Sequence, residues 1–145
     1  MLQPEPLGYY IKKIHQTFVS QSNKSLKKFG LTSSQLDILV YLLRHSDRVC
    51  TQREIEKYYG LSHATVIGTL QRLIDKGYIN VYASEEDKRQ RNVFLTDLAF
   101  EIEEEMVKEW ENNYNKFKRH MSEEEIENLV EGLKKVYIIL QEDDE

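Results

Sequence analysis

The sequence predicts a mainly α-helical protein with one small β-hairpin, which is an α+β fold. Apolar residues recur at spacings of three or four positions through most of the 145 residues, as the buried face of a helix requires. Three Ser or Thr residues are followed three positions later by Gln or Glu, the capping-box pattern typical of a helix start. The periodicity changes only between residues 78 and 95, where β-forming residues lie on both sides of a polar segment.

Two amphipathic helices are expected in the N-terminal part of the chain. The first runs from Leu7 to about Lys28 and is stopped by Gly30, a residue typical of helix ends. The second begins at Thr32, whose capping-box partner is Gln35. Their apolar faces consist of Leu7, Tyr10, Ile11, Ile14 and Phe18 in the first helix and Leu36, Leu39, Val40 and Leu43 in the second.

Two shorter helices separated by a glycine turn are predicted next. The first begins with the capping box Thr51 to Glu54 and ends at Gly60, and the second begins after Ser62 and ends near Gly77. Two short helices in this arrangement are the outline of a helix-turn-helix motif.

The helix after Ser62 has one apolar and one polar face. Its apolar side chains are Val66, Leu70, Leu73 and Ile74, and on or toward the opposite side lie Thr65, Gly68, Thr69 and Arg72. Small polar side chains with an arginine suit a helix that enters the major groove of DNA, where arginine pairs well with guanine. A helix face that is only exposed to solvent has a similar composition, so a face without DNA contacts is the alternative interpretation.

A hairpin is expected from the segments Tyr78 to Tyr82 and Asn92 to Leu95. The long loop between them, with the start of the second strand, carries Lys88, Arg89 and Arg91, a basic cluster suited to the minor groove or to phosphates. We expect Asp87 to hold an arginine by a local charge-assisted bond. A positioning helix, a reading helix and a basic hairpin in this order predict a winged helix-turn-helix.

The chain is expected to return to helix from Thr96, and Ser122 with Glu125 caps a last helix. The apolar stripes of these two helices comprise Ile102, Met106, Trp110, Tyr114 and Phe117, followed by Ile126, Leu129, Val130, Leu133, Val136, Tyr137 and Leu140. With the N-terminal helix, they have more apolar surface than one winged helix can cover, which predicts a partner subunit.

The formal net charge of -5 is unevenly distributed. Residues 1–43 hold five Lys against two acidic residues, residues 44–96 nine Lys or Arg against seven, and residues 97–145 six against sixteen. The first two thirds can therefore face a polyanion while the acidic last third faces away. No apolar run reaches the roughly 18 residues of a membrane span, and the start MLQPEPLGYY does not resemble a signal peptide, so a cytoplasmic location without membrane association is expected.

Other classes of function have less support in the sequence. A metal or redox sensor would have to use His15, His45, His63, His120 and Cys50, which lack the close spacing usual for zinc, and the lone cysteine has no partner to resolve it. No glycine-rich phosphate loop or nucleophile motif is present, so neither an enzyme nor a cofactor is expected. A winged helix used only for protein contact remains an alternative.

The motifs together resemble the MarR family of bacterial transcriptional regulators. The residues that carry the resemblance are Thr51-Gln-Arg-Glu-Ile, Ser62-His-Ala-Thr-Val, Arg72-Leu73, Lys76-Gly77, Asp87-Lys-Arg89, Leu95-Thr96, Gly30-Leu-Thr32 with Gln35, and Ser122-Glu-Glu-Glu. The wing pattern D-x-R with its following Leu-Thr is the most specific of them. Two departures are Gly68, where many members have Arg, and Glu56, where many have Ala.

The resemblance implies a homodimer in which each lobe reads half of a pseudo-palindromic double-stranded DNA operator. It implies a single domain over residues 1–145, with a DNA-binding lobe at 31–96 and dimerisation helices at 7–28 and 97–141. The implied recognition-helix contacts are Ser62, His63, Thr65, Thr69 and Arg72, with Lys88, Arg89 and Arg91 in the wing. His63 has the alternative of capping or packing.

The predicted function is that of a sequence-specific regulator, a repressor that occludes a promoter and is released by a small molecule. The resemblance implies a small aromatic effector, for which Tyr10 and Tyr41 are possible pocket residues. The alternative for both tyrosines is a place in the hydrophobic core.

Overall fold

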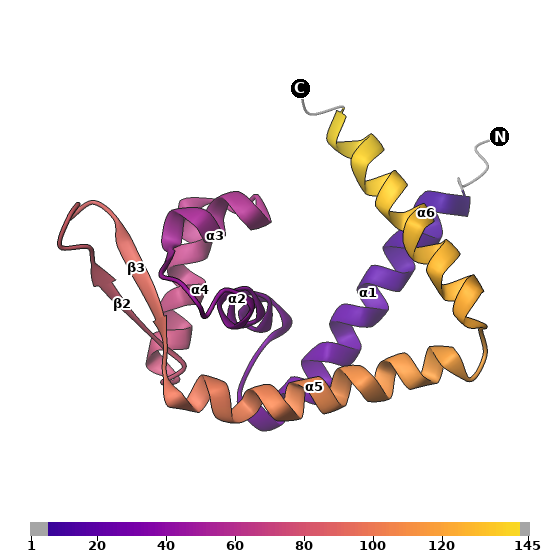
Figure 1. Cartoon of the computed structure of the whole chain (residues 1–145), viewed down its shortest axis with the longest axis horizontal. Coiled ribbons are helices and arrows are strands. Elements are labelled where there is room, and N and C mark those ends of the chain that lie inside the picture. Colours follow the sequence, from indigo (N-terminus) through magenta and orange to yellow (C-terminus); the bar gives the residue numbers. More distant parts are fainter. Residues whose placement is uncertain (1–5, 143–145) are drawn as a thin grey trace. The chain divides into compact units, whose positions relative to one another are not determined.

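The computed structural model describes residues 6–142 and confirms a mainly helical fold with a small antiparallel sheet. Figure 1 shows the elements in chain order, and their bounds follow. They are α1 (Pro6–Leu26), the short 3-10 helix η1 (Lys27–Phe29), α2 (Ser33–Arg44), β1 (Cys50–Thr51), α3 (Gln52–Tyr59), α4 (His63–Asp75), β2 (Ile79–Ala83), β3 (Arg91–Leu95), α5 (Asp97–Lys118) and α6 (Glu123–Glu142).

The chain divides into two compact units, residues 1–103 and 104–145. The described part of the first unit contains every element from α1 to β3 and the beginning of α5. The second contains the rest of α5 and α6. None of the helices among residues 6–142 is long and apolar enough to cross a membrane.

The core of the first unit lies where α2, α3, α4 and the sheet pack together (Figure 1). Helix α4 places Val66, Leu70 and Leu73 in this core, where each is at most 2% exposed. The predicted apolar face of this helix is therefore confirmed, although Ile74 is only half-buried. The other most deeply buried side chains are Ile38, Leu39, Cys50, Ile55 and Ile79.

The predicted helix starts are largely confirmed by side-chain hydrogen bonds. The Thr32 hydroxyl accepts from the Gln35 amide, and the Gln35 side chain accepts in return from the Thr32 amide, which makes a complete capping box. A second complete box joins Ser122 and Glu125. These bonds satisfy amide groups that the first helical turn leaves without a partner.

The capping box expected at Thr51 is only half present. Its hydroxyl accepts from the Glu54 amide at 3.2 Å, but the Glu54 carboxylate pairs with Arg48 at 2.8 Å and does not return to Thr51. Thr51 also belongs to a strand that the sequence analysis missed. Strand β1 has only two residues, so its sequence carries no alternation that could have predicted it.

The sheet has the strand order β1-β3-β2, with both pairs antiparallel. Val93 of β3 lies opposite both Val81 and Cys50, which places a buried residue at the centre of the sheet. The hairpin is anchored at its base by Thr96, whose amide donates to Tyr78 O and whose hydroxyl donates to Gly77 O. These two bonds fix the base of the hairpin next to the C-terminal end of α4.

Several apolar side chains of α1, α5 and α6 are exposed. Leu26 is the one fully buried residue within the described length of α1, and Tyr10 of the same helix is 61% exposed. The exposed large apolar residues of these helices are Leu7, Tyr9, Tyr10, Ile11, Ile14 and Phe18 in α1, Leu98, Phe100, Val107, Trp110, Tyr114 and Phe117 in α5, and Leu129, Val130, Leu133, Tyr137, Ile138, Ile139 and Leu140 in α6. Stripes of this kind mark surfaces that contact other molecules.

Truncation of the fully buried Leu73 to alanine is expected to lower the free energy of unfolding by about 2–5 kcal/mol, because it removes transfer free energy and leaves a cavity. Chemical denaturation of wild type and Leu73→Ala at equal protein concentration measures the difference. Gln71→Ala, at an exposed position of the same helix, is the matched control and should change stability by less than about 0.5 kcal/mol. Equal losses in the two variants would contradict the assignment of the buried face.

Candidate nucleic-acid interface

The exposed N-terminal end of α4 is organised by Ser62. Its side-chain oxygen accepts from the Thr65 amide at 3.2 Å and lies 2.8 Å from the Thr65 hydroxyl. Ser62, His63 and Thr65 are all exposed, as their predicted role as DNA contacts requires. The start of α4 therefore presents two hydroxyl groups held in a fixed mutual position.

The predicted exposure of Thr69 is wrong. Thr69 is only 8% exposed, and its hydroxyl donates to Thr65 O one turn earlier at 2.9 Å. The helical period of the sequence placed Thr69 toward the polar face. In the structure, Thr69 is adjacent to Leu70 and lies at the edge of the buried stripe. A hydroxyl already bonded to its own helix is poorly placed to donate to a base.

Arg72 lies on the exposed side of α4, and among residues 6–142 its guanidinium forms no ion pair. An added Cβ at Gly68 would lie 3.7 Å from the Arg72 Nη1 atom. The Arg72 guanidinium therefore lies near Gly68, at a distance where a Cβ would make only ordinary van der Waals contact. Next to this position, Ile67 exposes 44% of its surface, an apolar group of the kind that contacts the methyl of thymine.

A polar cluster joins α3 to the first residue of α4. His63 Nδ1 lies 2.6 Å from Glu56 Oε1, and Gln52 Nε2 donates to the same oxygen at 3.1 Å. The bond from Gln52 is the largest effect that holds the pKa of the Glu56 carboxyl below its ordinary value. Burial opposes it, and the bond with His63 adds a smaller lowering effect. The sequence motifs did not indicate this cluster, although Gln52 and Glu56 have the i, i+4 spacing of side chains that meet on a helix.

The wing loop between β2 and β3 is held by its own backbone. Ser84 donates to Gln90 O at 2.8 Å, and Gln90 donates to Asp87 O at 2.9 Å. Asp87 Oδ1 accepts from the Arg89 amide at 3.0 Å and lies 3.6 Å from Arg89 Nε. Asp87 therefore bonds mainly to the backbone amide of Arg89. The Arg89 guanidinium forms a longer ion pair with the same carboxylate, and the Arg89 side chain is 95% exposed.

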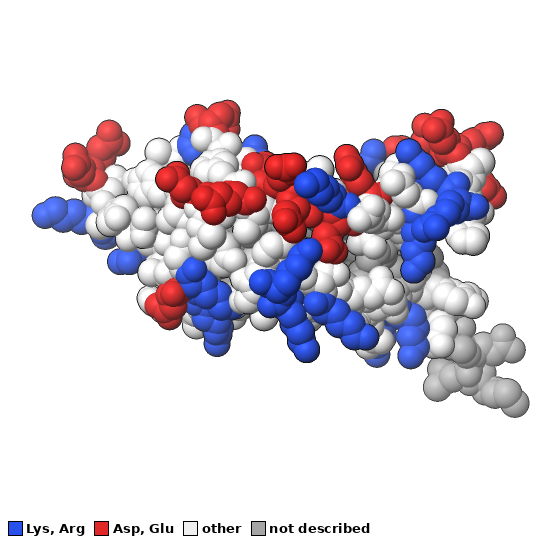
Figure 2. Space-filling model, turned by 90° about the horizontal axis from the view of Figure 1, so that it is seen from below, with Lys and Arg blue, Asp and Glu red and all other residues white. Residues whose placement is uncertain are grey.

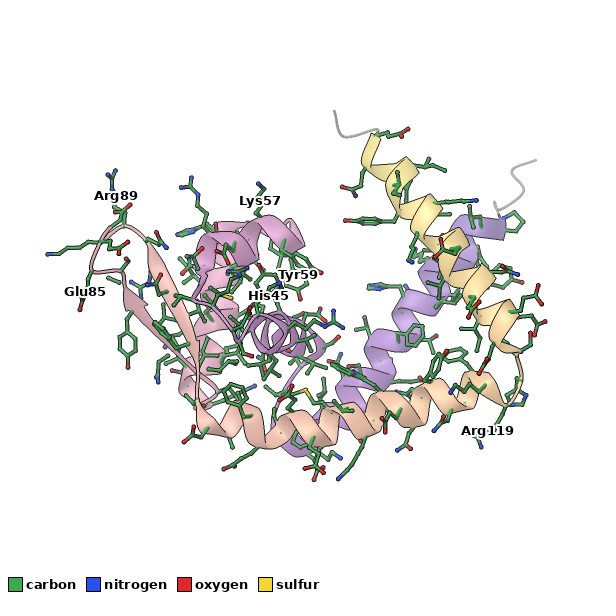
Figure 3. The ribbon with its side chains drawn as sticks, in the orientation of Figure 1. His45, Lys57, Tyr59, Glu85, Arg89 and Arg119 are labelled. Carbon is green, nitrogen blue, oxygen red and sulfur yellow. The ribbon has the colours of Figure 1, made fainter. Side chains whose placement is uncertain are left out.

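Basic groups of the lobe are exposed in more than one element. In Figure 3, Arg89 at the wing tip and Lys57 of α3 both point toward the top of the view, whereas Glu85 points the opposite way. Lys88 and Arg91 are exposed as well. Figure 2 shows Lys and Arg side chains beside Asp and Glu on one face, so the surface is not uniformly acidic despite the net charge of -5. Lys57 was not among the predicted contacts.

Comparison with known proteins identifies the family. The MarR family model matches residues 29–90, which include α2, β1, α3, α4, β2 and the whole wing loop. The HTH-type transcriptional regulator BilQ of Clostridioides difficile (strain CD3) is 27% identical over 135 residues, 91% of this chain and 88% of BilQ. The HTH-type regulator YwoH of Bacillus subtilis (strain 168) is 36% identical over 93 residues, 64% of this chain and 66% of YwoH.

This chain belongs to the MarR family. It is a transcription regulator with a DNA-binding winged helix, and not an enzyme. The crystal structure of the S. aureus MepR–DNA complex superposes with a TM-score of 0.86 at 26% identity, covering 94% of this chain and 99% of MepR. A MarR protein from Peptoclostridium difficile shares the fold, with a TM-score of 0.87 at 19% identity over 99% of this chain and 94% of that protein.

In this MarR protein, the two possible effector residues lie in different surroundings. Tyr10 is exposed on α1, whereas Tyr41 is only 7% exposed. The centroid of the Tyr41 ring lies 4.8 Å from that of Tyr58 and 6.2 Å from that of Tyr59. Neither lines the groove of about 510 Å³ along α1 or the cavity of about 410 Å³ between α2, β1, β3 and the start of α5. The packing of Tyr41 therefore agrees with the alternative that this residue belongs to the hydrophobic core.

The geometry around Cys50 bears on the redox alternative. Cys50 is 2% exposed, and its thiol donates to His45 O at 3.8 Å. Burial raises the pKa of the Cys50 thiol, and the opposing effect of Arg48 is smaller. Across residues 6–142, no group of three or more His, Cys, Asp or Glu is placed to hold a metal ion.

Cys50 is therefore expected to react slowly with a thiol reagent in the folded chain, because the reactive thiolate is disfavoured and access is blocked. The rate of reaction with Ellman's reagent at pH 7.5 should be a small fraction of the rate in guanidinium-unfolded protein. Cys50 is the only cysteine, so the whole signal reports on it. Equal rates in the two states would instead support a redox-sensing role.

Proposed function

We propose that this chain is a homodimeric repressor that binds a pseudo-palindromic operator and is released by a small aromatic effector. The observation that carries the DNA-binding part is the pairing of an exposed polar face on α4 with a cationic wing whose Arg89 is 95% exposed. The similarity to MepR, which has been solved in complex with DNA, supports the same use of the lobe here.

In this proposal, α4 reads base edges in the major groove. His63, Thr65 and Arg72 lie on its exposed surface, and Ser62 caps its start. A bidentate arginine contact to guanine discriminates against other bases by about 1–3 kcal/mol. Thr69 is not among these base contacts, because the residue is buried and its hydroxyl is bonded to its own helix.

The wing would bind the neighbouring minor groove or its phosphates through Lys88, Arg89 and Arg91. Backbone bonds within the loop support this role, since a preordered tip loses less conformational freedom on binding. Asp87 is occupied by the Arg89 amide and guanidinium, so its negative charge is partly offset before DNA arrives. Phosphate contacts of this kind position the lobe and do not themselves read sequence.

The dimer would form through the apolar stripes of residues 7–28 and 97–141, with residues 31–96 as the DNA-binding lobe. Support comes from the exposed side chains of α5 and α6, such as Trp110, Phe117 and Leu133. Lobes that read adjacent major grooves need roughly 34–36 Å between their recognition helices. An effector would release the protein only if it bound a different lobe spacing better than the DNA-competent one.

The substitution Arg89→Ala is expected to weaken binding to specific and random DNA alike. Loss of one phosphate contact should reduce the slope of log K against log salt concentration by about 0.9. Fluorescence anisotropy titrations at several salt concentrations measure the slope. Arg119→Ala, in the loop between α5 and α6, removes the same charge and is the control. An unchanged slope for Arg89→Ala would refute the wing assignment.

For Arg72→Ala, we expect a selective loss of affinity for the operator. The ratio of specific to random binding should fall by about five- to 150-fold, which corresponds to about 1–3 kcal/mol for one bidentate base contact. The DNA flanking the chain's own gene and a scrambled duplex are the two probes, and Arg89→Ala serves as the comparison that affects both. Equal losses on both duplexes would rule out a base-reading role for Arg72.

A further inference from the structure

The polar cluster that joins α3 to the start of α4 includes His63, one of the proposed DNA contacts. His63 is the first residue of α4, and its Nδ1 lies 2.6 Å from Glu56 Oε1. The Glu56 side chain is 19% exposed, whereas the His63 side chain is 69% exposed. The carboxylate is thus on the inner side of the contact and the imidazole on the outer side.

Gln52 fixes the carboxylate from the other side. Its amide is buried and donates to Glu56 Oε1 at 3.1 Å. The backbone of Glu56 is held as well, because Glu56 O accepts from the amides of Gly60 and Leu61 in the turn between the helices. One residue therefore defines both the turn and the position of the first side chain of the reading helix.

This arrangement determines which nitrogen of His63 carries the proton. An ionised carboxylate only accepts hydrogen bonds, so the nitrogen 2.6 Å from it must donate. In neutral His63, the proton is then on Nδ1, and Nε2 on the far side of the ring is an acceptor. Gln52 Nε2, 3.3 Å from the protonated Nδ1, donates to Glu56 and not to the ring.

We infer that Glu56 is a positioning residue that makes neutral His63 a base-reading acceptor through Nε2, whereas protonated His63 would be a donor there. The inference rests on the proposed DNA-binding function. As an acceptor, Nε2 suits the exocyclic amino groups of adenine or cytosine in the major groove. As a donor, it suits guanine, thymine O4 or a phosphate oxygen.

Because protonation converts Nε2 from an acceptor to a donor, binding to DNA should depend on pH through His63. Besides His63 and the neutral Gln52, the Arg53 charge on the same helix also acts on the Glu56 carboxylate and lowers its pKa. The ion pair with Glu56 keeps protonated His63 in place, so protonation changes the hydrogen-bonding character of Nε2 without releasing the ring.

The first experiment uses the DNA-free protein. Nitrogen-15 NMR of the imidazoles at pH 8 should show His63 as the Nδ1-protonated tautomer, with its signals assigned by their absence in His63→Gln. Glu56→Ala should shift His63 toward the Nε2-protonated form. Glu56→Gln should preserve the wild-type tautomer, because Gln52 and His63 both still need the side-chain oxygen as acceptor. An Nε2-protonated wild type, or no change in Glu56→Ala, would overturn the inference.

The second experiment measures affinity for the operator at pH 5.5 and pH 8. Wild-type affinity should differ between the two, and His63→Gln should remove most of that difference. At pH 8, Glu56→Ala should lower the affinity for the operator by about fivefold or more, since fivefold corresponds to the lower end of the energy of one base contact. Glu56→Gln should recover most of this loss. Glu127→Gln, which removes the same charge at an exposed position of α6, is the control.

The two experiments separate failure of the inference from failure of the proposed function. If the wild type does not bind DNA at all, the proposed function fails, while the tautomer measurement still tests the pair itself. If DNA binds but the pH effect persists in His63→Gln, the inference is overturned and the function stands. Thermal unfolding of each variant shows whether a loss of affinity reflects a loss of folded protein.

Discussion

Burial of the inner face of α4 is the constraint on which the winged-helix lobe depends. Val66, Leu70 and Leu73 are at most 2% exposed, and full burial of one such side chain contributes about 1.5–3 kcal/mol. A rotation of the helix would withdraw several of these groups from the core together. Because helix periodicity links the two faces, packing of the inner face also decides that Thr65 and Arg72 project outward.

Polar contacts then fix the ends of the elements around this core. The buried Gln35 completes the cap of α2 and also accepts from Lys76 Nζ at 2.7 Å, which ties the start of α2 to the end of α4. Thr96 performs a similar role at the base of the wing. These contacts add little apolar burial, but they hold α4 and the wing in a fixed relationship within the first unit. That relationship is what DNA recognition by two elements requires.

The acidic residues are placed so that the wing tip stays cationic although the whole chain is acidic. The wing tip carries Glu85 and Asp87 among its basic residues, yet Asp87 is used to order the loop and Glu85 points away from Arg89 (Figure 3). The acidic excess lies in residues 97–145, whose helices carry exposed apolar stripes suited to contact between protein chains. Separation of these roles along the chain lets one acidic protein present a cationic tip.

The sequence by itself determined the features that depend on groups within a few residues of each other. Caps at Thr32, Ser62 and Ser122, the glycine ends of helices and the apolar face of α4 all belong to this class, because the first helical turn and the 3.6-residue period are local. Only the tertiary structure decided the contacts between separate helices, strands and loops. It revealed strand β1, the burial of Thr69, the diversion of Glu54 to Arg48 and the bond from Glu56 to His63. Each of these depends on which neighbour packing brings within hydrogen-bonding distance, and a local pattern does not contain that information.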